Sequence, residues 1–121
     1  MTITLYMRKK FSYVSEINTS RGIWRMAMNR FLITYDLKKT SSNDRSSDYN
    51  KLYEKLSWYN KNARVTESSW IIKTYKPARE VYDNLASVLN SGDSIFITAI
   101  CDPALWYNCL TSDEKIKEVL N

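Results

Sequence analysis

Hydrophobic and polar positions divide most of this chain into short apolar runs and amphipathic stretches. Continuous runs rich in β-branched and aromatic residues occupy positions 31–37 (FLITYDL) and 94–100 (SIFITAI), and such runs are typical of buried strands. Two shorter runs, at 63–67 and 69–74, also favour strands because Trp, Ile and Val fit a pleated surface. Four strands are therefore predicted between residues 31 and 100.

Two stretches between these runs, and a third after them, show helical spacing. The apolar positions of the first, spaced i, i+3, i+4 and i+7, are Tyr49, Leu52, Tyr53 and Leu56. Ser47 is placed to cap this helix, and Pro77 suits the first turn of the second helix, which runs to the turn at Gly92. Thr111 and Glu114 form a capping-box pattern ahead of a third, short helix.

The order strand–helix–strand–strand–helix–strand predicts an α+β fold of the ferredoxin-like type. In this βαββαβ sandwich an antiparallel four-stranded sheet carries two helices on one face, and here a C-terminal extension with the third helix follows. The opposite face of the sheet needs a cover of its own because it is rich in Trp and Ile, and a second copy of the chain is the simplest candidate. We assign residues 28–121 to this domain and residues 1–27 to a basic N-terminal extension.

The N-terminal extension holds most of the net charge of the chain. The formal charge is +5, and residues 1–27 contain five Lys or Arg residues against Glu16 alone, so the predicted domain is close to neutral. Three interpretations of the extension stay open: a strand or arm packed on the domain, a partly disordered basic tail, or sequence upstream of a start at Met28. Because the basicity belongs to the extension, it is weak support for nucleic-acid binding by the domain.

The composition excludes several kinds of chemistry. The chain has no histidine, which removes Ser-His-Asp and Cys-His nucleophiles and the commonest zinc ligand. Cys101 and Cys109 lack zinc-motif spacing and are expected to stay reduced in a cytoplasm. No run approaches the roughly 20 apolar residues of a membrane span, so no membrane contact is expected. Catalysis would therefore rest on carboxylates, lysine, tyrosine or a bound cation.

Asp36, at the end of the first apolar run, is the principal candidate residue. The simplest interpretation is that it opens the polar loop at 38–47, since turns and loops often begin with Asp. That loop is ten residues long, however, and loops of this length are often functional. On the pattern alone, Asp36 can either open a polar loop or be a functional residue, and both interpretations stay open.

The strand ending Tyr35-Asp36-Leu37, the Tyr-rich helix that follows and the later segment 68–74 (SSWIIKT) resemble a known superfamily in their residues and their order. Over residues 28–108 the chain is similar to the second family of small CRISPR-associated proteins and to their relatives, the VapD ribonucleases and the SinR-like proteins. The resemblance is closest to the SinR-like branch, in which a strand ending in YDL and a later S-[ST]-W segment recur.

The resemblance implies a ferredoxin-like homodimer that acts on nucleic acid. The catalytic acid, here Asp36, ends the first strand of each subunit and faces its mate, and the two acids bind a divalent cation, Mg²⁺ or Mn²⁺, for cleavage of RNA more than DNA. Lys38, Lys39 and Arg45 in the following loop, and Ser69, would contact the substrate. Such a cation prefers oxygen ligands and can activate water, so this chemistry needs no histidine.

The chain departs from the family pattern at two places. The Arg-rich element that follows the acid in CRISPR-associated relatives is reduced to two lysines with Arg45 displaced, and Glu67-Ser68-Ser69 replaces a Gln-Gly-Ser motif. Three hypotheses stay open: a metal-dependent endonuclease, a non-catalytic dimer that binds nucleic acid or another protein, and a toxin or anti-defence component that acts through a protein partner. Glu67 as a second metal ligand, and Trp106 and Tyr107 as base-stacking residues, are secondary candidates.

Overall fold

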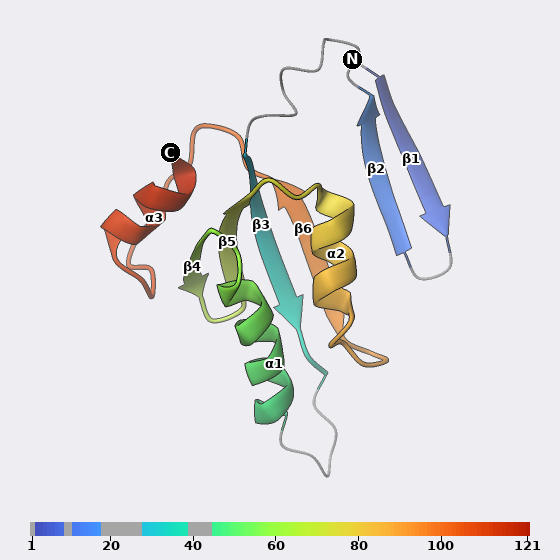
Figure 1. Cartoon of the computed structure of the whole chain (residues 1–121), viewed down its shortest axis with the longest axis horizontal. Coiled ribbons are helices and arrows are strands. Elements are labelled where there is room, and N and C mark those ends of the chain that lie inside the picture. Colours follow the sequence, from blue (N-terminus) through green and yellow to red (C-terminus); the bar gives the residue numbers. More distant parts are fainter. Residues whose placement is uncertain (1, 9–10, 18–27, 39–44) are drawn as a thin grey trace.

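The computed structural model of the chain describes residues 2–8, 11–17, 28–38 and 45–121. Within these residues a four-stranded antiparallel sheet and three helices form an α+β fold (Figure 1). The strands of this sheet are β3 (Asn29–Asp36), β4 (Lys61–Thr66), β5 (Ser69–Thr74) and β6 (Ser94–Ala99). The helices are α1 (Ser46–Ser57), α2 (Ala78–Ala86) and α3 (Asp113–Leu120). None of these described helices is long and apolar enough to cross a membrane.

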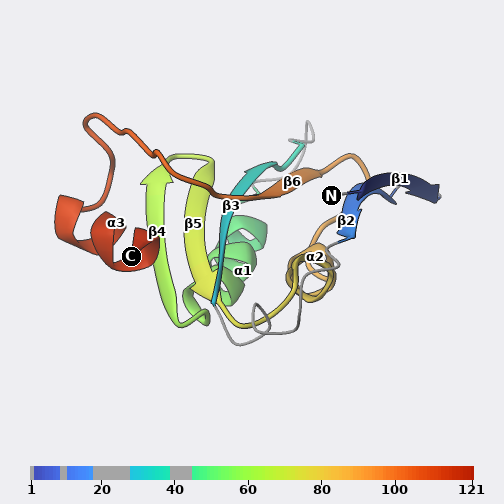
Figure 2. The ribbon, with the colours of Figure 1, turned by 90° about the horizontal axis from the view of Figure 1, so that it is seen from above.

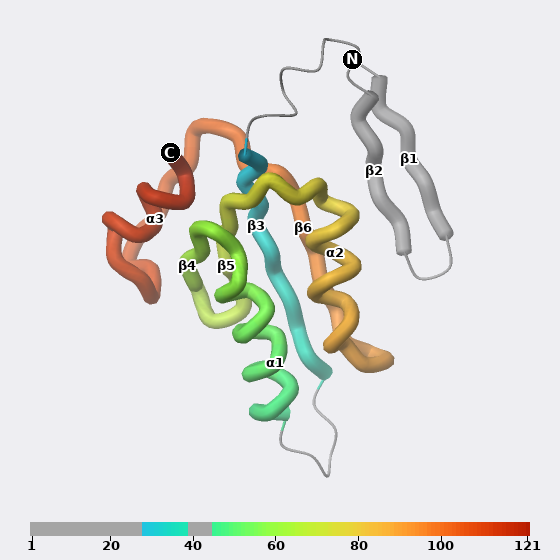
Figure 3. Tube along the Cα trace, viewed as in Figure 1, coloured from blue at the N-terminus to red at the C-terminus, as the bar shows by residue number. Residues whose placement is uncertain are grey.

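The strand order β4-β5-β3-β6 places the first and third strands of the predicted domain at the centre of the sheet. β3 pairs antiparallel with both neighbours, so that Ile33 lies opposite Trp70 of β5 and Ile97 of β6. The trace in Figure 3 can be followed from β3 through both helices to β6 and then to α3, apart from residues 39–44. This arrangement confirms the predicted ferredoxin-like fold with a C-terminal helix.

Alternate residues of the sheet and the apolar stripes of α1 and α2 form the main hydrophobic core. Phe31, Ile33 and Tyr35 of β3 are buried and pack with Leu52 of α1 and Leu85 of α2. Full burial of an aliphatic side chain stabilises a fold by roughly 1.5–3 kcal/mol. Figure 2 shows α1 and α2 together on one side of the sheet, so this face is closed by the chain's own helices.

The opposite face of the sheet is covered in part by α3. This helix contacts β4 and β5, and its buried residues Ile116 and Val119 pack with Ala63 of β4 and Ile71 of β5. The expectation that a second copy would cover this face is therefore wrong for its β4–β5 half, because the C-terminal tail folds back onto it. Over the β3–β6 half, which we call the open half, Phe96 of β6 is 62% exposed.

Two helix caps differ from the sequence-based expectation. Arg45 occupies the N-cap position of α1, and Ser47 lies inside the helix. α3 is capped by Ser112, whose Oγ accepts a hydrogen bond from the amide of Lys115 at 3.2 Å, and not by Thr111. Thr111 and Ser112 both carry a hydroxyl group that suits a cap. The helix α3 begins after Ser112 because the Ser112 oxygen reaches the amide three residues further along.

Part of the N-terminal extension also forms strands. β1 (Thr2–Arg8) and β2 (Phe11–Ile17) pair antiparallel as a separate two-stranded sheet. A strand or arm in the extension was one of the sequence-based alternatives, whereas a pair of strands was not predicted. Val14 and Ser15 interrupt the alternation of apolar and polar residues in β2, so the pattern of β2 carries a weak strand signal.

Candidate functional site

Asp36 is the last residue of β3 and lies on the face of the sheet that α3 partly covers. Side chains alternate along a strand, so Leu32, Thr34 and Asp36 share this face, while the intervening residues are buried in the main core. Asp36 is exposed, and its register partner is Ser94 at the start of β6. The predicted acid therefore lies in solvent at the end of the central strand.

A row of hydroxyl and aromatic residues crosses the sheet beside Asp36. Thr34 lies opposite Ser69 of β5 on one side and Phe96 of β6 on the other. Ser69 is thus a diagonal neighbour of Asp36 on the same face, an arrangement for which separations of about 7–8 Å are usual. The structure brings these two predicted site residues together at the Asp36 end of the sheet, with Asp36 on the open half and Ser69 on the adjoining strand β5.

The lysines predicted to contact substrate follow Asp36 in the chain. Lys38 is exposed, and its backbone amide donates a hydrogen bond to Oδ1 of Asp93 at 2.9 Å. Its side chain lies close to Gly92, which has a φ of +92°, a conformation that glycine adopts without strain. Lys39 lies outside the described residues, so its predicted contact with substrate stays a prediction.

Arg45 belongs to a buried charge cluster with two carboxylates. Its Nη2 lies 2.8 Å from Oδ2 of Asp93, its Nε lies 2.7 Å from Oδ2 of Asp48, and its Nη1 donates to the carbonyl oxygen of Lys38. The side chains of Arg45 and Asp93 are 8% and 0% exposed. Arg45 therefore joins the loop after β3, the first turn of α1 and the turn before β6, and this position gives no support to a contact with substrate.

Asp93 was not among the predicted site residues, although it holds this end of the sheet together. Burial alone would raise the pKa of its carboxyl group, but hydrogen bonds from Arg45 and from the amides of Asn90 and Lys38 lower the pKa below its usual value. The carboxylate is therefore ionised at neutral pH. In the sequence, Asp93 is recognisable only as an Asp that follows Gly92. Such a pair is common in turns, so the sequence did not mark Asp93 as a site residue.

On the helix side of β3, a hydrogen-bond network fixes the turn that leads into Ser69. The hydroxyl oxygen of Tyr35 accepts from Nε1 of Trp70 at 3.2 Å, and the same hydroxyl donates to the carbonyl oxygen of Glu67 at 3.1 Å. That carbonyl also accepts from Nη2 of Arg64 at 2.8 Å. Burial is the main cause that raises the pKa of Tyr35, so its phenol stays protonated and positions the turn without serving as a base.

The described residues at this corner form only part of a metal site. Among the described residues, no group of three or more His, Cys, Asp and Glu side chains is placed to hold a metal ion. Mg²⁺ is commonly bound by one or two carboxylates together with several waters. Asp36 and the nearby hydroxyl of Ser69 would supply part of such a coordination sphere.

The secondary candidates are divided between the core and the surface. Trp106 packs against the smaller core beneath α3, and its Nε1 donates to Oδ1 of Asp113 at 3.0 Å. Tyr107, the next residue, is 92% exposed. Glu67 is exposed in the turn between β4 and β5, and its backbone carbonyl, described above, is the group that takes part in the hydrogen-bond network.

Comparisons of the chain with protein-family models and with curated proteins return no match. A functional assignment therefore rests on the residues themselves. The features that carry it are the exposed Asp36 and Phe96, which lie on the open half of the sheet, and Ser69 on the neighbouring strand β5.

Proposed function

We propose that the chain acts as a homodimer that cleaves RNA, with a divalent cation, Mg²⁺ or Mn²⁺, bound between the Asp36 carboxylates of the two subunits. The observation that carries this proposal is the exposed Asp36 at the end of the central strand, on the open half of the sheet. Catalytic groups need supporting contacts that fix their geometry. The Arg45–Asp93 cluster and the Tyr35 network supply such contacts on either side of Asp36.

The exposed apolar surface of the open half supports dimerisation. Phe96 is 62% exposed near the middle of β6, with Thr34 beside it in the register. An exposed aromatic side chain can be buried by association, and two-fold symmetric pairing of identical surfaces is the commonest form of homodimer. A two-fold axis close to this corner would bring Asp36 towards the partner's Asp36.

Two carboxylates with bound waters would match the oxygen ligands that Mg²⁺ prefers. A cation held there would polarise a phosphoryl oxygen and lower the pKa of a bound water. The chain's own residues would hold the metal through Asp36, contact an oxygen of the substrate through Ser69 and attract its phosphates through Lys38 and Lys39. The free thiols of the chain suit a reducing cytoplasm, where we place this activity.

The burial of Arg45 favours a second candidate, a non-catalytic dimer that serves as a binding or adaptor protein. Because Asp93 and Asp48 bind the guanidinium group, the described residues near Asp36 offer fewer cations to a phosphate than the sequence predicted. In this alternative a partner protein would bind the apolar C-terminal segment, where Leu105 and Tyr107 are 93% and 92% exposed.

The test compares wild-type protein with Asp36→Asn on labelled single- and double-stranded RNA and DNA, in Mg²⁺, in Mn²⁺ and with chelator. Asp83→Asn is the matched control, because Asp83 is an exposed acid on α2, away from the open half. We expect metal-dependent cleavage of RNA by the wild type and the control, and a loss of about 100-fold or more in Asp36→Asn, as for other groups that stabilise transition-state charge.

Light scattering on the same samples measures the oligomeric state, and Phe96→Arg is expected to convert dimers to monomers and abolish cleavage. Equal cleavage by the wild type and Asp36→Asn would indicate a contaminating nuclease. A stable dimer that cleaves nothing in either metal would contradict the nuclease and leave the adaptor. A wild-type monomer would contradict both candidates.

A further inference from the structure

A second open feature lies at the other end of β3, on the helix side of the sheet. A cleft of about 340 Å³ between the end of α1 and the start of α2 is lined by residues that include Trp58, Tyr59, Asn60, Lys76, Glu80 and Asn84. Small-molecule sites commonly have volumes of roughly 300–1,000 Å³. The cleft is thus large enough for one planar group.

The cleft is remote from the predicted cleavage site. Asn29, the first residue of β3, donates a hydrogen bond from Nδ2 to the carbonyl oxygen of Lys76 at 3.0 Å. β3 has eight residues counting both Asn29 and Asp36, so the two ends are roughly 23 Å apart along the strand at about 3.3 Å per residue. A ligand in the cleft would therefore contact the protein without reaching Asp36.

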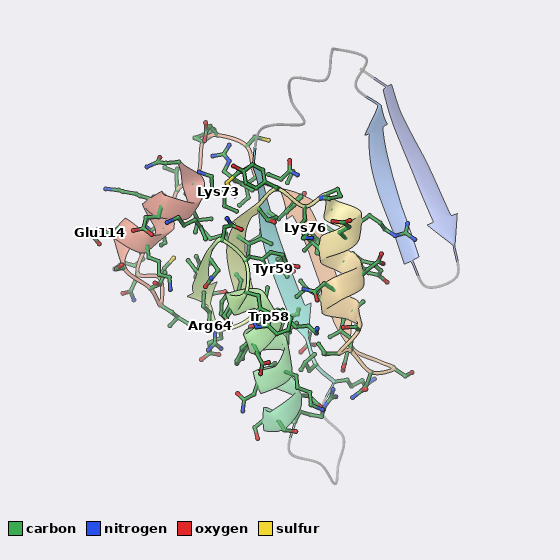
Figure 4. The ribbon with its side chains drawn as sticks, viewed as in Figure 1. Trp58, Tyr59, Arg64, Lys73, Lys76 and Glu114 are labelled. Carbon is green, nitrogen blue, oxygen red and sulfur yellow. The ribbon has the colours of Figure 1, made fainter. Side chains whose placement is uncertain are left out.

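Trp58 provides an exposed aromatic wall. It follows the last turn of α1, where its amide donates to the carbonyl oxygen of Lys55 at 3.2 Å, and it is 64% exposed. The ammonium group of Lys55 lies 5.0 Å from the centroid of the Trp58 ring, a distance that allows a cation–π contact. Figure 4 shows Trp58 and Tyr59 beyond the end of α1 and Lys76 near the start of α2. An exposed indole held in this way is a surface on which a base can stack.

Tyr59 and Asn84 form a polar wall of the cleft. Nδ2 of Asn84 donates to the hydroxyl oxygen of Tyr59 at 2.8 Å, and Oδ1 of Asn84 accepts from Nζ of Lys55 at 3.3 Å. Burial raises the pKa of Tyr59, and the hydrogen bond from Asn84 offsets part of this rise, so the phenol is protonated at neutral pH. Because the oxygen accepts from Asn84, the hydroxyl hydrogen is oriented away from that amide and can be donated to a ligand.

Lys76 and Glu80 form a charged rim. Nζ of Lys76 lies 3.9 Å from Oε2 of Glu80, and both side chains are more than half exposed. Exposed pairs of this kind contribute little to stability, so each group can exchange its partner for a ligand at small cost. The carboxylate accepts hydrogen bonds from N–H groups, and the ammonium group donates to a carbonyl or phosphate oxygen.

We propose that this cleft binds an unstacked guanine base of a single-stranded RNA, with the base stacked on Trp58. Single-stranded RNA is commonly recognised by stacking on aromatic side chains and by hydrogen bonds to the base edge. Guanine presents two adjacent donors, N1–H and the N2 amino group, to the Glu80 carboxylate, and its O6 accepts from Lys76 or Tyr59. The inference rests on the proposed function for the identity of the RNA, and it adds a contact to the strand far from Asp36.

The experiment is an NMR titration of the ¹⁵N-labelled full chain with guanosine 5′-monophosphate and, separately, with uridine 5′-monophosphate. We expect saturable shifts of the Trp58 indole and Asn84 amide signals, with binding of the uridine nucleotide at least about fivefold weaker. Trp58→Ala is expected to weaken binding of the guanosine nucleotide at least about fivefold, the lower end of the range for loss of one base–aromatic stack. Leu110→Ala, which removes an exposed apolar side chain outside the cleft, is expected to leave it unchanged.

Two further variants sharpen the result. Glu80→Gln is expected to reduce the preference for the guanosine nucleotide, and Asp36→Asn is expected to bind it as the wild type does. Unchanged binding by Trp58→Ala, shifts confined to residues outside the cleft, or equal affinity for both nucleotides would overturn the inference, whatever the cleavage assay shows. Binding in the cleft by a protein that never cleaves RNA would support the nucleotide site and contradict the nuclease alone. Trp58→Phe repeats the stacking test with a smaller ring if Trp58→Ala loses its dispersed spectrum.

Discussion

The two ends of the central strand β3 are held by different kinds of interaction. Where the strand ends with Asp36, a buried ion pair between Arg45 and Asp93 joins the following loop to the turn before β6. Where the strand begins, partly exposed interactions, such as the hydrogen bond from Asn84 to Tyr59 and the Lys76–Glu80 pair, border an open cleft. The comparison shows that a charged side chain close to a candidate site can be bound entirely by other groups of the fold. A cleft far from that site presents side chains that a ligand can reach.

The difference also predicts how each end responds to change. Breaking a buried ion pair leaves an uncompensated charge and is strongly destabilising. Amide and hydroxyl groups beside an open cleft can instead exchange their hydrogen bonds for bonds to water at small net cost. We therefore expect the Asp36 end to be rigid and the cleft end to adapt to a ligand.

The largest effect is expected from removal of Arg45. Arg45→Ala leaves the carboxylate of Asp93 buried without its partner, and we expect the thermal midpoint to fall by about 10 °C. The matched control is Arg79→Ala, which removes an exposed arginine whose Nε lies 3.6 Å from Oδ1 of Asp83, and it should lower the midpoint by no more than about 2 °C. Calorimetry measures both midpoints, and equal shifts in the two variants would contradict the buried role of Arg45.

The same ion pair predicts a loss of stability in acid. The pKa of Asp93 is lower in the folded chain than its usual value, which is about 3.9 for an unperturbed Asp. Its contribution is therefore fully present above that value and is lost as the pH falls through the folded pKa. Urea denaturation at a series of pH values should show a steeper acid loss in the wild type than in Asp93→Asn, whereas Asp83→Asn should keep the wild-type slope. A wild-type slope in Asp93→Asn would assign the acid loss to other carboxyl groups.

The sequence was sufficient to predict the parts of the fold that depend on local periodicity. The apolar runs at 31–37 and 94–100 became β3 and β6, and the helical spacing around Leu52 became α1. The return of the C-terminal tail to the sheet was not predictable in this way. It depends on contacts between distant segments, such as the hydrogen bond from the amide of Leu110 to the carbonyl oxygen of Val65.

The same limit applies within the candidate site. The position of Asp36 follows from a strand that ends in an acid. A basic residue in the next loop has the same local pattern whether it contacts a phosphate or, as Arg45 does, a carboxylate 48 residues further along the chain. The cleft escaped prediction for a similar reason, because Trp58 and Glu80 come from two different helices that only the fold brings together.

The smallest effect on stability is expected when one hydroxyl group is removed at each end of β3, from Tyr35 or from Tyr59. Tyr35→Phe leaves the buried indole N–H of Trp70 without its acceptor, and we expect the free energy of unfolding to fall by about 1–3 kcal/mol. Tyr59→Phe removes the acceptor of Asn84 beside the open cleft, where water can replace it, so the expected loss is about 0.5–1 kcal/mol. Each substitution keeps the ring and removes one oxygen atom, so urea denaturation with a common m-value compares the two ends directly. A loss of unfolding free energy at Tyr59 as large as that at Tyr35 would mean that water does not replace the missing acceptor in the cleft. That result would argue against a cleft whose polar groups exchange partners for a ligand.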